Sequence, residues 1–140
     1  MGLDMIIYAH KYDNTDKINE ILKIINNYQL HYIKYEIMYW RKFYPIHNWF
    51  VENIMDGNED IFNSKKRYIP REKLYELKDI CENIINNHQK ASILLPNIDE
   101  NDIYDEYYFD NIKYTYSRLE IILNEEGFKK DCKFYYLGAW

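Results

Sequence analysis

The chain has few of the residues that most often mark a turn, a disulfide or a metal site: four glycines, three prolines and two cysteines in 140 residues. No glycine-rich loop of the form GxGxxG or GxxxxGKS/T is present, which argues against phosphate binding by such a loop. Cys81 and Cys132 lie far apart, and neither CxxC nor HExxH occurs. We therefore expect two reduced thiols, with no metal and no cofactor.

Long hydrophobic runs are missing as well. No segment approaches the roughly 20 apolar residues that span a bilayer, and the chain does not start with the basic stretch and apolar run of a signal peptide. These absences predict a cytoplasmic protein without membrane contact. A net charge of -5 argues against a general duplex-DNA binder, because such affinity rests on many cationic contacts to phosphate. A small nucleotide in a locally basic pocket remains compatible with this charge.

Aromatic residues, by contrast, are abundant: they make up 18% of the chain, and 16 of them are tyrosines. Tyrosine packs like an apolar residue while its hydroxyl seeks a partner, so we expect many of these side chains at half-buried edges. The hydrophobic fraction of 47% is ordinary for a folded protein. The chain is most simply one globular domain, residues 1–140, large enough to bury a core without staples.

Periodicity predicts the elements. The predicted helices cover about 16–27, 45–56, 71–88 and 105–125, and the predicted strands cover 5–8, 32–40 and 132–137. A short extended piece at 68–70 follows a polar surface loop over 57–67, which ends in the basic run Lys65-Lys66-Arg67. The predicted fold class is therefore α+β: a small antiparallel sheet of about three strands, packed with about four helices. The pattern leaves the strand order open.

A candidate ligand site stands where the central strand ends. That strand alternates with period two, so its odd-numbered residues suit the core and Trp40 faces the other way. Arg41 and Lys42 follow Trp40 directly, and His47 and Trp49 come at the start of the next helix. Aromatic planes beside cationic donors suit a flat, negatively charged ligand, and the free N–H groups of a helix start favour phosphate. A ligand site and a core with a polar rim are both open readings.

Three further residues extend this candidate site. Asn53 lies one helical turn from Trp49, and Tyr107 and Arg118 form a second stripe on the last helix. The tyrosines would also suit stacking on single-stranded nucleic acid, but such binding needs a basic groove, and the loop before these tyrosines is acidic. No serine or cysteine nucleophile lies near His47 in sequence, so no catalytic residue is predicted.

Short motifs along nearly the whole chain also occur together in one family, and the most specific of them lie between residues 36 and 57. They are Gly2-Leu3-Asp4-Met5, Glu36-Ile37, Tyr39-Trp40-Arg41-Lys42, Ile46-His47, Trp49-Phe50-Val51, Asp56-Gly57, Tyr104-Asp105-Glu106-Tyr107, Phe134-Tyr135-Tyr136 and Trp140. In these motifs the chain resembles a family of small bacteriophage and prophage proteins, some of which are labelled phosphoglycerate kinase. That label fails physically, because such a kinase needs two domains and a phosphate cradle. The chain departs from the family's pattern at 43–45 and 138–139.

The resemblance implies a phage protein in the cytoplasm of a bacterial host, and it leads to three hypotheses. The first is a protein that sequesters a nucleotide-derived immune signal, with a small anionic ligand at the predicted site. The second is an inhibitor that presents its tyrosines to a host defence protein. The third is a hydrolase of a nucleotide signal, which would require turnover. A homo-oligomer is compatible with each hypothesis.

Overall fold

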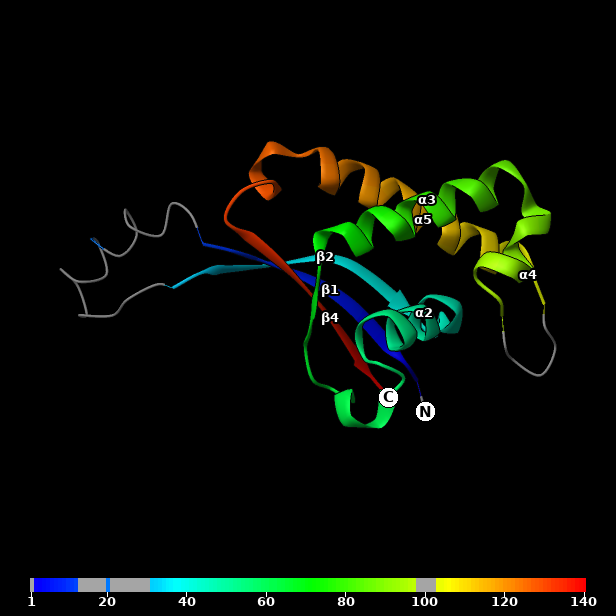
Figure 1. Ribbon diagram of the computed structural model, residues 1–140, viewed down its shortest axis with the longest axis horizontal. Coiled ribbons are helices and arrows are strands. Elements are labelled where there is room, and N and C mark those ends of the chain that lie inside the picture. Colours follow the sequence, from blue (N-terminus) through cyan, green and yellow to red (C-terminus); the bar gives the residue numbers. More distant parts are fainter. Residues whose placement is uncertain (1, 13–19, 21–30, 98–102) are drawn as a thin grey trace.

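One antiparallel sheet forms the centre of the molecule (Figure 1). The computed structural model describes residues 2–12, 20, 31–97 and 103–140. Its strands are β1 (Asp4–Lys11), β2 (Ile33–Arg41), β3 (Arg67–Ile69) and β4 (Cys132–Ala139), in the order β2-β1-β4-β3. The sheet has four strands rather than about three, since the short piece predicted at 68–70 joins its edge as β3. The helix predicted over about 16–27 lies outside the described residues, apart from Glu20.

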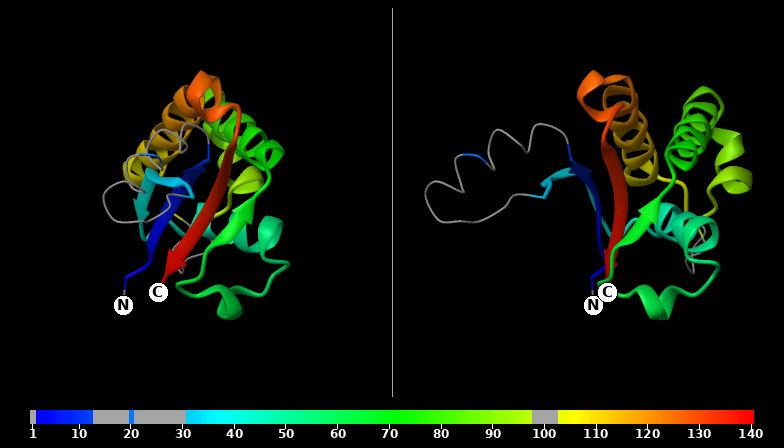
Figure 2. Two further views of the ribbon diagram at one scale, coloured as in Figure 1. Left: turned by 90° about the vertical axis from the view of Figure 1, so that its left-hand side faces the viewer. Right: turned by 60° about the vertical axis from the view of Figure 1, so that its left-hand side comes forward.

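The first and last strands of the chain are neighbours in the sheet. β1 lies between β2 and β4, so that Asp4 stands opposite both Arg41 and Ala139. Figures 1 and 2 show the start of β1 beside the end of β4. Residues from both ends of the sequence and from its first third therefore meet at one end of the sheet.

The described helices pack on one face of the sheet (Figure 2, right). They are α2 (Tyr44–Ile54), α3 (Arg71–Asn86), the short α4 (Ala91–Leu94) and α5 (Glu106–Asn124). The buried residues of α3 are the ones that periodicity predicts: Leu74, Leu77, Cys81 and Ile84. Pro45 fits the first turn of α2, and the Asp105 side chain caps α5 by accepting the Tyr108 N–H at 3.0 Å. The α+β fold class is confirmed, and α4 is a helix that periodicity did not reveal.

The face assignment of β2 is corrected by a bulge. The pairing of β2 with β1 shifts register at Ile37, which is an extra residue without a partner of its own on β1. A bulge of this kind reverses the alternation of side chains beyond it. Trp40, predicted to face away from the core, is therefore only 1% exposed, whereas Tyr39, predicted to face inward, is 44% exposed.

The predicted surface loop over 57–67 is partly regular structure. It contains the 3-10 turn η1 (Glu59–Phe62), and its last residue, Arg67, begins β3. The Arg67 guanidinium lies over the ring of Phe62, and its Nε donates a hydrogen bond of 2.6 Å to the carbonyl of Ile54. These contacts fix the approach of the chain to β3.

The second face of the sheet has no described helix on it, and we call it the open face (Figure 2). On β1 the residues that point to the helices, Met5, Ile7 and Ala9, are completely buried. The alternating residues between them, Tyr8 among them, point to the open face, as the two-residue period of a strand requires. None of the helices among the described residues is long and apolar enough to cross a membrane.

Candidate functional site

The two tryptophans predicted to stack on a ligand are core residues, and this prediction is corrected. Trp40 is 1% exposed, and its Nε1 donates a hydrogen bond of 2.8 Å to the hydroxyl of Thr115 on α5. Trp49 is 8% exposed and packs edge-on against Phe50, with ring centroids 5.2 Å apart. An indole packed in this way has no free face for a ligand. The bulge in β2 is the reason that Trp40 turns inward.

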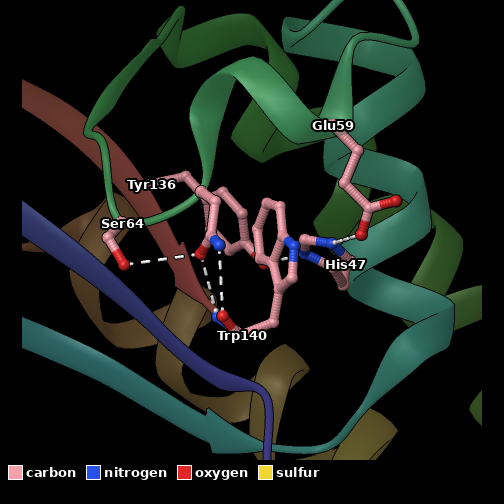
Figure 3. A network of polar contacts seen from close by, with 6 residues as sticks. His47, Glu59, Ser64, Tyr136 and Trp140 are labelled. Carbon is pink, nitrogen blue, oxygen red and sulfur yellow. Dashed lines mark hydrogen bonds and ion pairs between the residues drawn. The ribbon is translucent and has the colours of Figure 1, made fainter.

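His47, also predicted as a ligand contact, is completely buried in a polar network (Figure 3). Its Nε2 lies 2.7 Å from Oε1 of Glu59, and its Nδ1 lies 2.6 Å from the hydroxyl of Tyr136. In the neutral imidazole Nε2 donates to Glu59, because a carboxylate only accepts, and Nδ1 accepts the Tyr136 hydroxyl proton. Burial, and then the charge of Glu59, raise the pKa of Tyr136 and so keep its phenol a donor.

The last residues of β4 close over this histidine. A Cβ at Gly138 would lie 3.1 Å from Cε1 of His47, and the ring of Trp140 stands edge-on to the imidazole at 5.0 Å. Asn63 holds Trp140 by accepting its N–H at 3.0 Å and by donating to its carbonyl at 3.1 Å. The packing leaves His47 out of reach of a substrate, so the network joins α2, η1 and β4 as a structural connection.

Arg41 and Lys42 are exposed at the end of β2, where the Tyr107 hydroxyl donates to the carbonyl of Arg41. Lys42 and Tyr107 line a hollow of about 230 Å³ beside the start of α2, and Asp105 also lines it. Asn53 lines a different hollow, of about 280 Å³, between α2 and β3. The eight residues proposed from the sequence therefore do not form one binding cavity.

Three side chains of α5 form hydrogen bonds with backbone groups on the free edge of β2. The contacts are Tyr107 Oη to the carbonyl of Arg41, the N–H of Tyr39 to Tyr114 Oη at 3.1 Å, and Arg118 Nη2 to the carbonyl of Ile37 at 2.7 Å. Unpaired backbone groups on an edge strand are a template for aggregation, and side chains from a packed helix remove it. Tyr107 and Arg118 thus have a structural role, and their assignment as ligand contacts stays a prediction.

A cluster that the sequence did not single out lies on the open face. The ammonium groups of Lys34 and Lys66 both lie over the ring of Tyr8, at 4.7 and 4.6 Å from its centroid. Nζ of Lys66 is also 3.5 Å from Nε2 of His10, and the other side of the cluster is closed by Tyr32, which stacks on His10 at 4.4 Å. Two cations and a histidine are thus gathered around aromatic planes.

The charges in this cluster repel one another. Partial burial, and then the charge of Lys34, lower the pKa of Lys66, while burial followed by the charges of Lys66 and Lys34 lowers the pKa of His10. Among the described residues neither lysine forms an ion pair with a carboxylate. Glu36 shares the open face, opposite Tyr8. An anion between the ammonium groups would relieve this repulsion.

Strand pairing and one anchored loop bring the cluster together. Lys34 stands opposite His10 in the pairing of β2 with β1. Lys66 arrives from the loop before β3, where the N–H of Ser64 donates to the carbonyl of Gly138 at 2.8 Å. The sequence signals were the basic run at 65–67 and the alternating position of Lys34, but only the register shows that they meet.

The chain matches no protein-family model, no curated protein and no solved structure. Among the described residues no three histidine, cysteine, aspartate or glutamate side chains are grouped so that they could hold a metal ion. The chemistry of the site itself is therefore the basis for a functional assignment.

Proposed function

We propose that this protein binds an anionic, nucleotide-like ligand on its open face, with a phosphate group between Lys34 and Lys66. The observation that carries the proposal is the convergence of these two ammonium groups on the ring of Tyr8, at 4.7 and 4.6 Å. Hydrogen bonds between ammonium and phosphate are charge-assisted and contribute about 1.5–3 kcal/mol each. A ligand phosphate would offset the mutual repulsion of the lysines.

The aromatic side chains of the cluster favour a ligand with a planar group beside its phosphate. Tyr135 stands next to Tyr8 on β4, and its ring is 4.4 Å from that of His10. A base that stacks on an aromatic side chain gains about 1–3 kcal/mol. A nucleotide supplies both the anion and the plane, whereas inorganic phosphate supplies only the first.

Binding without turnover fits the open face best. The histidine with the most developed network, His47, is buried away from this surface. The resemblance to phage proteins supports a role in which the protein acts in the host cytoplasm and holds a nucleotide-derived defence signal away from its receptor. The lysine cluster replaces the end of β2 as the location of the ligand in this proposal.

Calorimetry and thermal shift with cyclic dinucleotides, ADP-ribose and mononucleotides test the proposal. We expect Lys66→Gln to weaken binding about tenfold or more, because one charge-assisted contact is lost. Lys113→Gln, which removes an exposed lysine of α5, is the matched control and should bind like the wild type. If Arg41→Ala removes binding and Lys66→Gln does not, the ligand sits at the end of β2, and the open-face location is wrong.

Chromatography of each bound ligand after prolonged incubation separates binding from hydrolysis. We expect the ligand to be recovered unchanged. New products that form with wild-type protein and disappear with Lys66→Gln would establish turnover and would contradict sequestration.

A further inference from the structure

Two rows of side chains run across the open face, perpendicular to the strands. Strand pairing aligns Lys34, His10 and Lys133 on β2, β1 and β4, and we call them the cationic row after its two lysines. His10 between them is only 6% exposed. It also aligns Tyr8, Tyr135 and Tyr68 on β1, β4 and β3 as a tyrosine row. The rows are two residues apart along the strands, which corresponds to about 7 Å. A row of donors for phosphate thus lies parallel to a row of stacking planes.

The tyrosine row continues beyond the lysine pair. The rings of Tyr68 and Tyr135 are 5.9 Å apart, and Tyr68 is 48% exposed at the edge of the sheet. Burial, and then a hydrogen bond with Tyr12, raise the pKa of Tyr135 to about 12, so that its phenol stays uncharged beside a phosphate. At the other end, Glu36 stands opposite Tyr8 and places a negative charge where the row meets β2.

The cations are likewise spread over more than one phosphate position. Lys34 belongs to β2, Lys133 to β4, and Lys66 to the loop before β3. The ammonium groups of Lys34 and Lys66 meet over Tyr8, whereas β1 separates the strand of Lys34 from the strand of Lys133. Neighbouring strands are about 4.8 Å apart, so Lys133 starts about 10 Å from Lys34. The spacing suits a chain of phosphates, and aromatic rings beside such a chain are the usual platform for unpaired bases. In the tyrosine row the ring of Tyr68 is exposed, and those of Tyr8 and Tyr135 are half-buried.

We propose that the natural ligand of the open face is a single strand of nucleic acid that crosses the strands of the sheet, with phosphates on the cationic row and bases on the tyrosine row. This inference rests on the proposed function, because it uses the same anion-binding open face, and it names a polymer as the natural ligand in place of a small defence signal. Duplex is a poor fit, since its bases are stacked on one another and offer no free faces to the tyrosines.

Fluorescence anisotropy with labelled oligothymidylate and oligouridylate of about ten nucleotides tests the inference. We expect either oligomer to bind at least tenfold more tightly than its mononucleotide and a duplex of the same length to bind at least tenfold more weakly than the single strand. Three lysine contacts predict that the logarithm of the affinity falls with the logarithm of salt concentration with a slope of about -2. The DNA and RNA oligomers are separate arms and show which sugar is preferred.

Variants distinguish the inference from the proposed function. Tyr68→Ala should weaken oligonucleotide binding about fivefold or more and leave mononucleotide binding unchanged, and Tyr68→Leu repeats the test with the apolar bulk kept. Lys133→Gln should reduce the salt dependence, whereas the control Lys113→Gln should not. Equal affinity for oligomer and mononucleotide, with both lost in Lys66→Gln, would overturn the inference and leave the proposed function intact. Failure of every nucleotide to bind would overturn both.

Discussion

Around Gly138 the protein is packed so closely that an added methyl group would have to push its neighbours aside. A Cβ there would meet His47 Nδ1 and Trp140 Cζ3, each at 3.2 Å. The imidazole is held by Tyr136, and the backbone of Trp140 is held by Asn63. The absence of a side chain at this position is what allows β4 to cover the imidazole. Glycine is required here by close approach rather than by backbone conformation.

Gly138→Ala is therefore expected to lower the free energy of unfolding by about 1–3 kcal/mol, which is the usual cost of forcing extra volume into a packed site. Gly127→Ala is the matched control, because a Cβ at Gly127 would meet only the Glu125 side chain, at 3.8 and 3.9 Å. Urea unfolding followed by tryptophan fluorescence measures both changes. Equal stability of the two variants would show that the rings of His47 and Trp140 move aside at little cost.

The buried hydrogen bond between Trp40 and Thr115 makes a second prediction at the level of single residues. Thr115→Val removes the acceptor of the Trp40 N–H and should destabilise the protein by about 1–3 kcal/mol, because a buried donor is left without a partner. Trp40→Phe removes the donor, and the double variant should be less destabilised than the sum of the two. A double-mutant cycle by chemical denaturation measures this coupling, and additive effects would contradict it.

At the scale of elements, α5 provides hydrogen-bond partners for the edge strand β2, as a further neighbouring strand would. Three of its side chains bond to alternate backbone groups along the free edge, and their spacing on the helix keeps them on one side. The tyrosines have this role because α5 packs beside β2 and their hydroxyls reach its backbone. On a helix that did not pack beside a strand, the same tyrosines would be surface residues. Protection of the edge follows from packing between two elements and not from the strand itself.

Tyr114→Phe should expose the N–H of Tyr39 to exchange. The substitution keeps the ring and removes only the hydroxyl that accepts this N–H at 3.1 Å, at a net cost of about 0.5–1.5 kcal/mol. Amide hydrogen exchange followed by NMR should show several-fold faster exchange at Tyr39. Tyr75→Phe on α3 is the control, since the Tyr75 hydroxyl makes no hydrogen bond among the described residues. Unchanged exchange at Tyr39 would mean that Tyr114 does not protect the edge.

At the scale of the whole molecule, charge is distributed unevenly. The chain has a net charge of -5, yet Lys34, Lys66 and Lys133 gather on the open face. A local cationic surface on an acidic protein can attract an anionic ligand while the rest of the surface repels other nucleic acid. Overall charge is therefore a poor guide to what this face binds.

The cluster also predicts how stability depends on pH. Because the pKa of His10 is lower in the folded protein than its ordinary value of 6.5, the unfolded chain takes up a proton first as the pH falls. Stability contributed by neutral His10 is present above that value and is lost as the pH falls below it. Thermal unfolding of wild type and His10→Gln between about pH 7.5 and pH 5 should show a shallower decline for the variant. Parallel declines would exclude His10 as a source of the pH dependence.

Much of the fold can be read from local patterns. The apolar stripes of α3 and α5 and the proline at the start of α2 depend only on residues within one element, and the structure bears them out. The face of Trp40 was predicted wrongly, because a bulge at Ile37 depends on pairing with β1 and leaves no mark in the sequence of β2. The same limit explains why the partners of His47 were missed: they lie 12 and 89 residues away.

The sequence by itself determined the fold class, the helices over α2, α3 and α5, and the presence of many tyrosines and few reactive groups. Tertiary structure decided which of these residues are available to a ligand: it buried Trp40, Trp49 and His47, and it brought Lys66 to His10 across 56 residues of chain. The physical reason is that periodicity acts through the backbone of one element, whereas a binding surface depends on strand register and on packing between distant segments.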